Sequence, residues 1–187
     1  MNSQQIKEIL LSEIHEVSIN YEKYCNDPKR DFSRKRKLPF ELMLKNIIGM
    51  GSKSITNELI DIFQASGEMP SASAFVQQRT KIKPEALKAV FDGFMSRILT
   101  SADKMRILAV DGSDIQIETN PKDETSHIST STDKKSFNLL HLNALYDLEE
   151  HVYSDAIIQA AKNQNEHGAL NEMVDRSEIP KALVIAD

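Results

Sequence analysis

The feature that most constrains this fold is a short apolar run that ends in carboxylates. Residues Ile107–Val110 are all apolar and are followed by Asp111, Gly112, Ser113 and Asp114. A run in which every residue is apolar, and not only every second one, is typical of a strand covered on both faces. Glycine then permits a sharp turn. We therefore predict a buried strand that ends in an acidic turn, with Asp111 at its end.

A second segment repeats this design. Residues 182–186 are apolar and are followed by Asp187. If the two strands lie side by side and parallel, Asp111 and Asp187 meet at one sheet edge, where their carboxylates repel each other unless a cation lies between them. Carboxylate oxygens suit hard cations, so the pattern indicates a Mg²⁺ or Mn²⁺ site. Two unrelated strand-end aspartates remain the alternative.

The residues between these two segments predict the rest of a sheet. Residues 137–148 alternate between apolar and polar types, as in a half-buried strand, and a hairpin turn then leads to a further strand around 152–158. Asn165 is placed to cap a helix that precedes the last strand. The polar segment 119–136 is expected to be a long loop, and its His127 is more typical of a solvent-facing side chain than of a metal ligand.

The first 104 residues show helical rather than strand periodicity. Apolar residues recur there at steps of three and four, with Ser3 as the expected first cap. The predicted helices span 3–25, 40–48, 55–63, a segment that starts at Ser71 or Ser73, and 84–99. Gly49 and Gly51 separate the second helix from the third, as the joint of a helix-turn-helix requires.

Two polar groups in this half are candidates for DNA contact. One is the basic run 29–37, and the other is the polar face of the helix after Ser73, where Gln and Arg are the usual base-reading side chains. The candidates are Arg34, Lys35, Arg36, Lys37, Gln77, Gln78, Arg79 and Lys81. A solvated linker and the solvent face of an ordinary helical bundle are the alternatives.

Charge and composition narrow the class of protein. Residues 1–104 carry 16 Lys and Arg against 13 Asp and Glu, whereas residues 105–187 carry 7 against 15. This division suits a DNA-binding part joined to a metal-binding part. Cys25 is the only cysteine, which excludes an intrachain disulfide or a cysteine-based zinc site. No signal-peptide pattern or long apolar run is present, so we expect a cytoplasmic protein with no membrane partner.

Five motifs occur in an order and spacing that resemble one known family. They are Ala109–Ser113, Thr119–Asp123, Leu140–Asp147, Asn165–Glu166 and Ile185–Asp187. Together they are similar to bacterial insertion-sequence transposases of the DDE type (IS-four-like), over roughly residues 70–187. The resemblance implies an α+β protein, with an all-α, helix-turn-helix-like DNA-binding domain at 1–104. It also implies an RNase H-like core at 105–187, built from three antiparallel strands, a helix and a parallel strand.

The same resemblance implies a chemistry and its residues. Asp111 and Asp187 match the first two acids of the Asp, Asp, Glu triad, which holds two Mg²⁺ or Mn²⁺ ions for cleavage and joining of DNA. The implied partner is the double-stranded DNA of transposon terminal inverted repeats, and a homodimer is compatible with a complete enzyme. The third acid of the family lies in a Tyr, Arg, Glu, Lys helix motif beyond the second aspartate, and it has no counterpart here.

Three classes of function therefore remain open. The first is a transposase fragment with an incomplete core, which we expect to be inactive alone. The second is a non-catalytic protein that occupies transposon ends and inhibits the complete enzyme. The third is an unrelated metal-dependent hydrolase. Binding to terminal inverted repeats separates the first two classes from the third, and strand transfer separates the first from the second.

Overall fold

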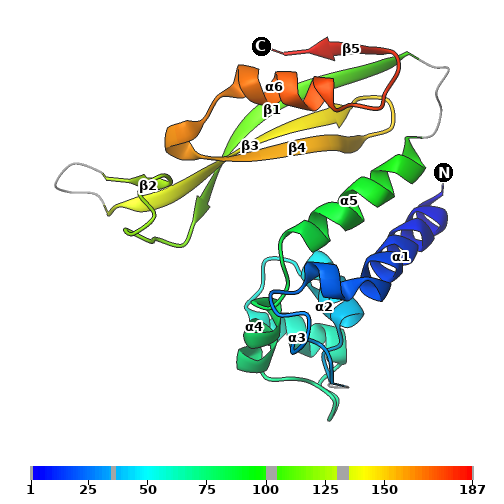
Figure 1. The fold of residues 1–187 in the computed structure, drawn as a ribbon, viewed down its shortest axis with the longest axis vertical. Helices are drawn as coiled ribbons and strands as arrows, with labels where there is room; N and C mark the ends of the chain where they lie inside the picture. The colour runs from blue at the N-terminus through cyan, green and yellow to red at the C-terminus, as the bar shows by residue number, and fades with distance from the viewer. Residues whose placement is uncertain (1, 35–36, 100–104, 130–134, 187) are drawn as a thin grey trace. The chain divides into compact units, whose positions relative to one another are not determined.

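A computed structural model of the protein describes residues 2–34, 37–99, 105–129 and 135–186. The chain divides into two compact units, Met1–Ile98 and Leu99–Asp187. The first is helical and the second contains a mixed sheet with one long helix, which agrees with the expected α+β class (Figure 1). Three of the predicted site residues, Lys35, Arg36 and Asp187, lie outside the described residues.

The helical unit buries its apolar residues in two clusters. Its elements are α1 (Ser3–Ile19), a 3-10 turn η1 (Tyr21–Tyr24), α2 (Phe40–Gly49), α3 (Ile55–Phe63), α4 (Ala72–Arg79) and α5 (Glu85–Ile98). Ile14, Leu44 and Val90 join α1, α2 and α5 in the first cluster. In the second cluster, Leu59 and Phe75 bring α3 and α4 against α2. Helix α2 therefore contributes to both clusters and connects the two halves of this unit.

The first helix differs from its prediction at both ends. Its cap is Asn2 rather than Ser3, because the Asn2 side chain accepts a hydrogen bond from the Gln5 backbone while the Gln5 side chain accepts one from Asn2. The helix ends at Ile19 rather than near residue 25. Asn20 stops it, because its side-chain amide donates to the Glu16 carbonyl and its backbone N–H to the Val17 carbonyl.

The second unit is a five-stranded sheet with one helix packed on it (Figure 1). Its elements are β1 (Arg106–Ile117), β2 (His127–Ile128), β3 (Phe137–Asp147), β4 (Val152–Ala160), a short turn η2 (Ala161–Asn163), α6 (Glu166–Asp175) and β5 (Ala182–Ile185). Strand β3 pairs antiparallel with β1, β2 and β4. Strand β5 pairs parallel with β1, with Ala109 opposite Ile185. The parallel pairing of the two apolar-run strands is thus as predicted.

The end predicted for the first strand is wrong. Strand β1 continues through Gly112 to Ile117, so Asp111 lies within the strand, opposite Ala144 of β3. No described glycine has a positive φ angle, which excludes a left-handed turn at Gly112. The glycine serves a close approach instead, because a Cβ atom there would lie 2.6 Å from His141 Nε2.

Helix α6 covers one face of the sheet. Leu108, Leu145 and Met173 form a buried apolar cluster beneath it. The polar residues His141, Asn143 and Asp147 of β3 are also buried, whereas Leu142, Ala144 and Tyr146, which alternate with them, are only half-buried. The helix-covered face therefore buries both apolar and polar side chains, whereas the opposite face is more open. No helix within the described ranges is long and apolar enough to cross a bilayer.

Candidate metal and DNA-contacting sites

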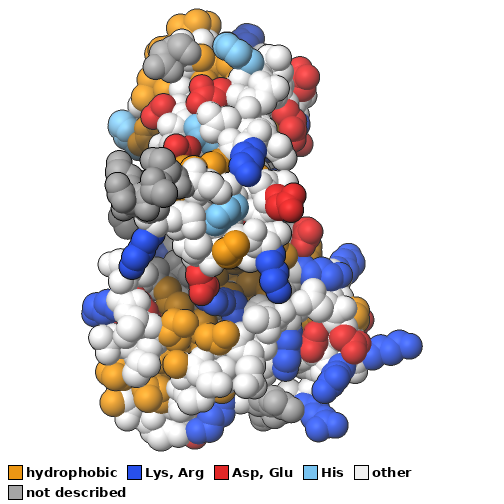
Figure 2. Space-filling view, turned by 90° about the vertical axis from the view of Figure 1, so that its left-hand side faces the viewer, with side chains coloured by type: hydrophobic (Ala, Val, Ile, Leu, Met, Phe, Trp, Pro, Cys, Tyr) orange, Lys and Arg blue, Asp and Glu red, His pale blue; other side chains and the backbone are white. Residues whose placement is uncertain are grey.

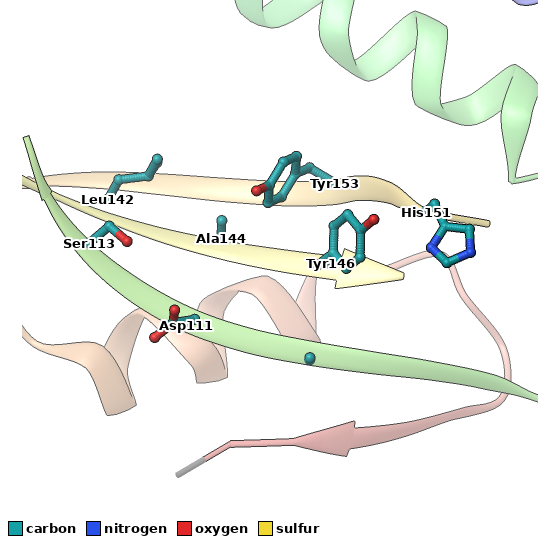
Figure 3. A pocket seen from close by; sticks show the side chains of 8 residues that line it. Asp111, Ser113, Leu142, Ala144, Tyr146, His151 and Tyr153 are labelled. Atoms are coloured by element: carbon teal, nitrogen blue, oxygen red, sulfur yellow. The ribbon is translucent and has the colours of Figure 1, made fainter. Parts of the chain in front are cut away.

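Asp111 lies on the face of the sheet opposite α6. Its carboxylate faces a hollow of about 500 Å³ with Ser113, Ala144, Tyr146 and Tyr153 among the lining residues (Figure 3). The two tyrosine rings pack edge to face at 5.0 Å between centroids. Asp111 is exposed and, over the part of the chain that is described, makes no hydrogen bond or ion pair. Both of its oxygen atoms are therefore available to an external cation.

A second, smaller hollow lies on the other side of the strand at the same position. It measures about 30 Å³, and its lining includes Asp111, Asn143, Glu166, His167 and Ala186. The start of α6 and the residue after β5 therefore lie close to the β1 backbone at Asp111. A volume of this size corresponds to about one water molecule.

The donor types at this point fit Mg²⁺ or Mn²⁺. Asp111 offers free carboxylate oxygens on a rigid strand, and hard divalent cations prefer such ligands while retaining several waters. Among the described residues, however, no group of three or more His, Cys, Asp or Glu side chains is arranged so that it could hold a metal ion. Asp111 alone therefore represents the candidate site in the described part of the chain, since Asp187 falls outside it.

A charged cluster beside Asp111 was not predicted from the sequence. His141 Nδ1 lies 2.9 Å from Asp114 Oδ1, and its Nε2 lies 3.0 Å from Glu166 Oε1. The second contact lacks hydrogen-bond alignment and is an ion-pair contact. The histidine is 5% exposed, and its ring lies directly against Gly112. His141 thus lies between two carboxylates, that of Glu166 from another motif and that of Asp114 from the predicted acidic turn.

The opposite end of β1 is fixed by a buried ion pair. Arg106 Nη1 lies 2.9 Å from Asp147 Oδ2, and these side chains are 2% and 0% exposed. Glu150 Oε1 lies 3.2 Å from the same Arg106 nitrogen. Asp147 Oδ1 accepts the backbone N–H groups of Glu149 and Glu150, which closes the turn before β4. The start of β1 and the end of β3 are therefore joined by an ion pair as well as by the backbone hydrogen bonds between the two strands.

The polar segment after β1 is ordered around Asn138. This side chain is fully buried; its Oδ1 accepts from Asn120 N–H, and its Nδ2 donates to Asn120 O and Ser126 Oγ. His127 Nδ1 lies 3.0 Å from Asn138 Oδ1, so His127 belongs to this network. Hydrogen bonds from Ser126 and Thr125 hold the pKa of Asp123 below its ordinary value.

In the helical unit, the two predicted DNA-contacting groups come together. Arg34 from the basic run and Gln77, Gln78 and Lys81 from α4 and the residues after it line one hollow of about 620 Å³. Figure 2 shows several Lys and Arg side chains projecting from this unit. The basic run is anchored by Phe32, whose ring packs edge-on against Phe40 at 5.2 Å. Its first part is therefore a fixed loop and not a free linker.

The predicted contact residues differ in how available they are. Arg34, Gln77 and Arg79 are exposed. Gln78 is 7% exposed, and its Oε1 accepts a hydrogen bond from Lys81 Nζ at 2.7 Å. Lys37 donates to the Gly67 carbonyl at 2.8 Å. Arg34 and Gln77 are therefore the exposed members of the predicted set that line the hollow.

Comparison with known proteins identifies the second unit. Residues 102–187 match the family model of the transposase DDE domain. The match covers every strand of the sheet and α6, and it confirms the DDE-type resemblance that the motifs indicated. The comparisons with curated proteins and with solved structures found no match. For the transposase DDE domain, a DNA substrate and divalent metal ions are the general expectation.

Proposed function

We propose that the chain is part of a DDE transposase, in which Asp111 and Asp187 bind divalent metal ions for cleavage and joining of transposon-end DNA. The supporting observation is the parallel pairing of β1 with β5 inside the region that matches the transposase DDE domain. Asp111 follows Ala109 by two residues, and Asp187 follows its partner Ile185 by two residues. The RNase H-like core and the domain boundary near residue 104 belong to the same proposal.

In this proposal, the residues of the chain bind and orient, and none acts as a covalent nucleophile. The Mg²⁺ or Mn²⁺ ions, when bound, activate the attacking oxygen and stabilise the leaving one. Asp111 offers an ionised carboxylate from a strand held at one end by the Arg106–Asp147 ion pair. The open face around Asp111 leaves room for a phosphate backbone beside that carboxylate.

A Mn²⁺ titration followed by paramagnetic line broadening tests the metal site. We expect broadening centred on β1 and the start of α6, with loose, roughly millimolar binding, because few carboxylates contribute and several waters remain. Asp111→Asn should abolish the broadening. The control is Asp175→Asn, an exposed aspartate at the far end of α6. Broadening that ignores Asp111, or spreads evenly over the acidic surface, would refute the site.

We further propose that the helical unit binds duplex DNA in the manner of a helix-turn-helix, through α4 and the loop before α2. Support comes from the shared hollow of Arg34, Gln77 and Lys81 and from the short connection between α2 and α3. Each phosphate contact adds about 0.9 to the slope of log affinity against log salt. Arg34→Ala with Lys81→Ala should therefore flatten the slope for an inverted-repeat duplex.

The matched control for the DNA measurement is Lys88→Ala. Lys88 lies on α5, where it pairs with Asp92. It carries the same charge as Lys81 but does not line the hollow. The control should leave the salt slope unchanged. Equal slopes for the double variant and the unaltered protein would assign the basic run to solvent and remove the DNA-contact proposal.

A second candidate is a non-catalytic protein that occupies transposon ends. It rests on the helical unit, where Arg34, Gln77 and Lys81 line one hollow and no metal is needed. Metal-dependent nicking of a transposon-end duplex that Asp111→Asn abolishes supports the enzyme. End binding that needs no divalent metal and is unchanged in Asp111→Asn supports the non-catalytic function.

A further inference from the structure

The cluster of Asp114, His141 and Glu166 packs against Gly112, the residue after the proposed metal ligand Asp111. Each ring nitrogen of His141 lies within about 3 Å of a carboxylate oxygen, at 2.9 Å for Asp114 and 3.0 Å for Glu166. His141 Nδ1 is in hydrogen-bond alignment with Asp114, whereas the buried Nε2 contacts Glu166 without such alignment. The two contacts hold the ring on both sides, next to the β1 backbone.

We propose that His141 forms a clamp with Asp114 and Glu166 that positions the β1 backbone at Asp111. The clamp joins three elements, because Asp114 belongs to β1, His141 to β3 and Glu166 to the first turn of α6. This inference rests on the proposed function for its link to the metal, whereas the clamp itself stands on the contacts.

The clamp acts on Asp111 through Gly112. An added Cβ at Gly112 would lie 2.6 Å from His141 Nε2 and 2.9 Å from Glu166 Oε1, so both clamp residues press on the strand at this point. Asp111 is the preceding residue and projects to the opposite face of the sheet. Fixing the backbone beneath Gly112 therefore fixes the direction of the Asp111 carboxylate. His141 is thus a positioning residue, and it does not itself touch the proposed metal.

The start of α6 is the second element that the clamp holds. Asn165 caps the helix by accepting the Gly168 N–H at 2.9 Å, and its own N–H donates to Gln159 Oε1 of β4 at 2.9 Å. Gln159 Oε1 also accepts from the buried Asn143 side chain at 3.3 Å. The other titratable groups here are Asp111 and His167, which line the small hollow with Glu166. The contact of His141 with Glu166 therefore joins the start of the helix to the sheet, as the Arg176–Asp155 ion pair does at its other end.

The first test measures amide hydrogen exchange around Gly112 in the full chain. Asp114→Ala and Glu166→Ala should each accelerate exchange there up to about five-fold, because each removes one contact that holds the His141 ring against the strand. Exchange around Gly112 that neither variant changes would overturn the clamp.

The second test separates positioning from charge. Hydrogen exchange in the first turn of α6 should accelerate about five-fold in Glu166→Ala, as for loss of a partly exposed ion pair, and stay near the original rate in Glu166→Gln. His141→Gln should weaken Mn²⁺ binding at Asp111 about ten-fold, the lower end for contacts behind a metal ligand. Unchanged or tighter Mn²⁺ binding in His141→Gln would overturn the inference.

The two proposals fail in different ways. If Mn²⁺ does not bind near Asp111 in the unaltered protein, the metal site is refuted, and with it the positioning of a metal ligand by His141. The exchange rates around Gly112 and in α6 do not depend on metal. Unchanged exchange in Glu166→Ala, measured without metal, would overturn the clamp even where Asp111 binds Mn²⁺. Because Glu166 is 62% exposed in its side chain, its variants test the clamp even if His141→Gln fails to fold.

Discussion

Replacing Asp147 by asparagine should destabilise the sheet unit more than any surface change nearby. The substitution retains Oδ1, which accepts the Glu149 and Glu150 backbone N–H groups, and replaces Oδ2, which faces Arg106 at 2.9 Å. Arg106 is 2% exposed, so its charge remains in a buried position beside an amide that can donate. Breaking one side of a buried ion pair costs about 3 to 5 kcal/mol.

The lower end of that range applies here. Glu150 Oε1 remains 3.2 Å from Arg106 Nη1, and its side chain is 42% exposed, so it offsets part of the loss. Exposed pairs contribute about 0.2 to 1 kcal/mol. We therefore expect a net cost of about 3 kcal/mol, which corresponds to a roughly 150-fold loss of hydrogen-exchange protection in β1 and β3. Exchange measured by peptide or by amide resolves these strands within the full chain.

Two controls test the reasoning. Glu150→Gln should cost less than about 1 kcal/mol, because that carboxylate is partly solvated. The double variant Asp147→Asn with Arg106→Met should recover most of the loss, since it removes the buried charge along with its partner. If the double variant is no more stable than Asp147→Asn alone, the cost does not come from removing the Asp147 carboxylate beside the buried Arg106 charge, and the argument is refuted.

Three further predictions follow from contacts described above. Gly112→Ala should cost about 1 to 3 kcal/mol by overpacking against His141, whereas Gly49→Ala, with no atom within 4 Å of its added Cβ, should cost little; urea unfolding measures both. Cys25 is buried and its pKa is raised to about 11 by desolvation, so alkylation near pH 8 should be at least about 100-fold slower than in urea-unfolded protein. The lowered pKa of Asp123 means that its contribution to loop order is present above the ordinary aspartate pKa and is lost as pH falls through the lowered value. Amide exchange at Ser126 in Asp123→Asn should therefore be fast at all pH values.

The sequence predicted the strand order well because hydrophobic periodicity reports directly on the elements. The α6 cap at Asn165 and the hairpin at Asp147 carry local signals. The parallel β1–β5 pairing was instead expected from the repeated design of apolar strand and aspartate and from the family resemblance. The function of Gly112 could not be predicted from local pattern. A glycine after an apolar run predicts a turn. Only the position of the His141 ring, which a Cβ atom would meet, shows why a glycine is needed inside the strand.

The candidate site was predictable only in part. Asp111 stands out because it follows an apolar run, but the contacts of Asp114, His141 and Glu166 join residues far apart in sequence. The helical unit shows the same limit. Arg34 and Gln77 were predicted from separate composition signals, and nothing local indicates that one hollow contains both. Similarly, the sequence indicates an accessible Gln78, but its Oε1 accepts a hydrogen bond from Lys81 Nζ.

The network around Asn138 implies an uneven tolerance of substitution in the loop between β1 and β3. Its one amide group serves as acceptor for Asn120 N–H and as donor to Asn120 O and Ser126 Oγ. Aspartate cannot supply the donors, leucine supplies neither function, and glutamine places both one carbon too far away. In a library of single substitutions, position 138 should therefore accept almost no replacement, although it lies next to a stretch of serines, threonines and lysines that appears interchangeable.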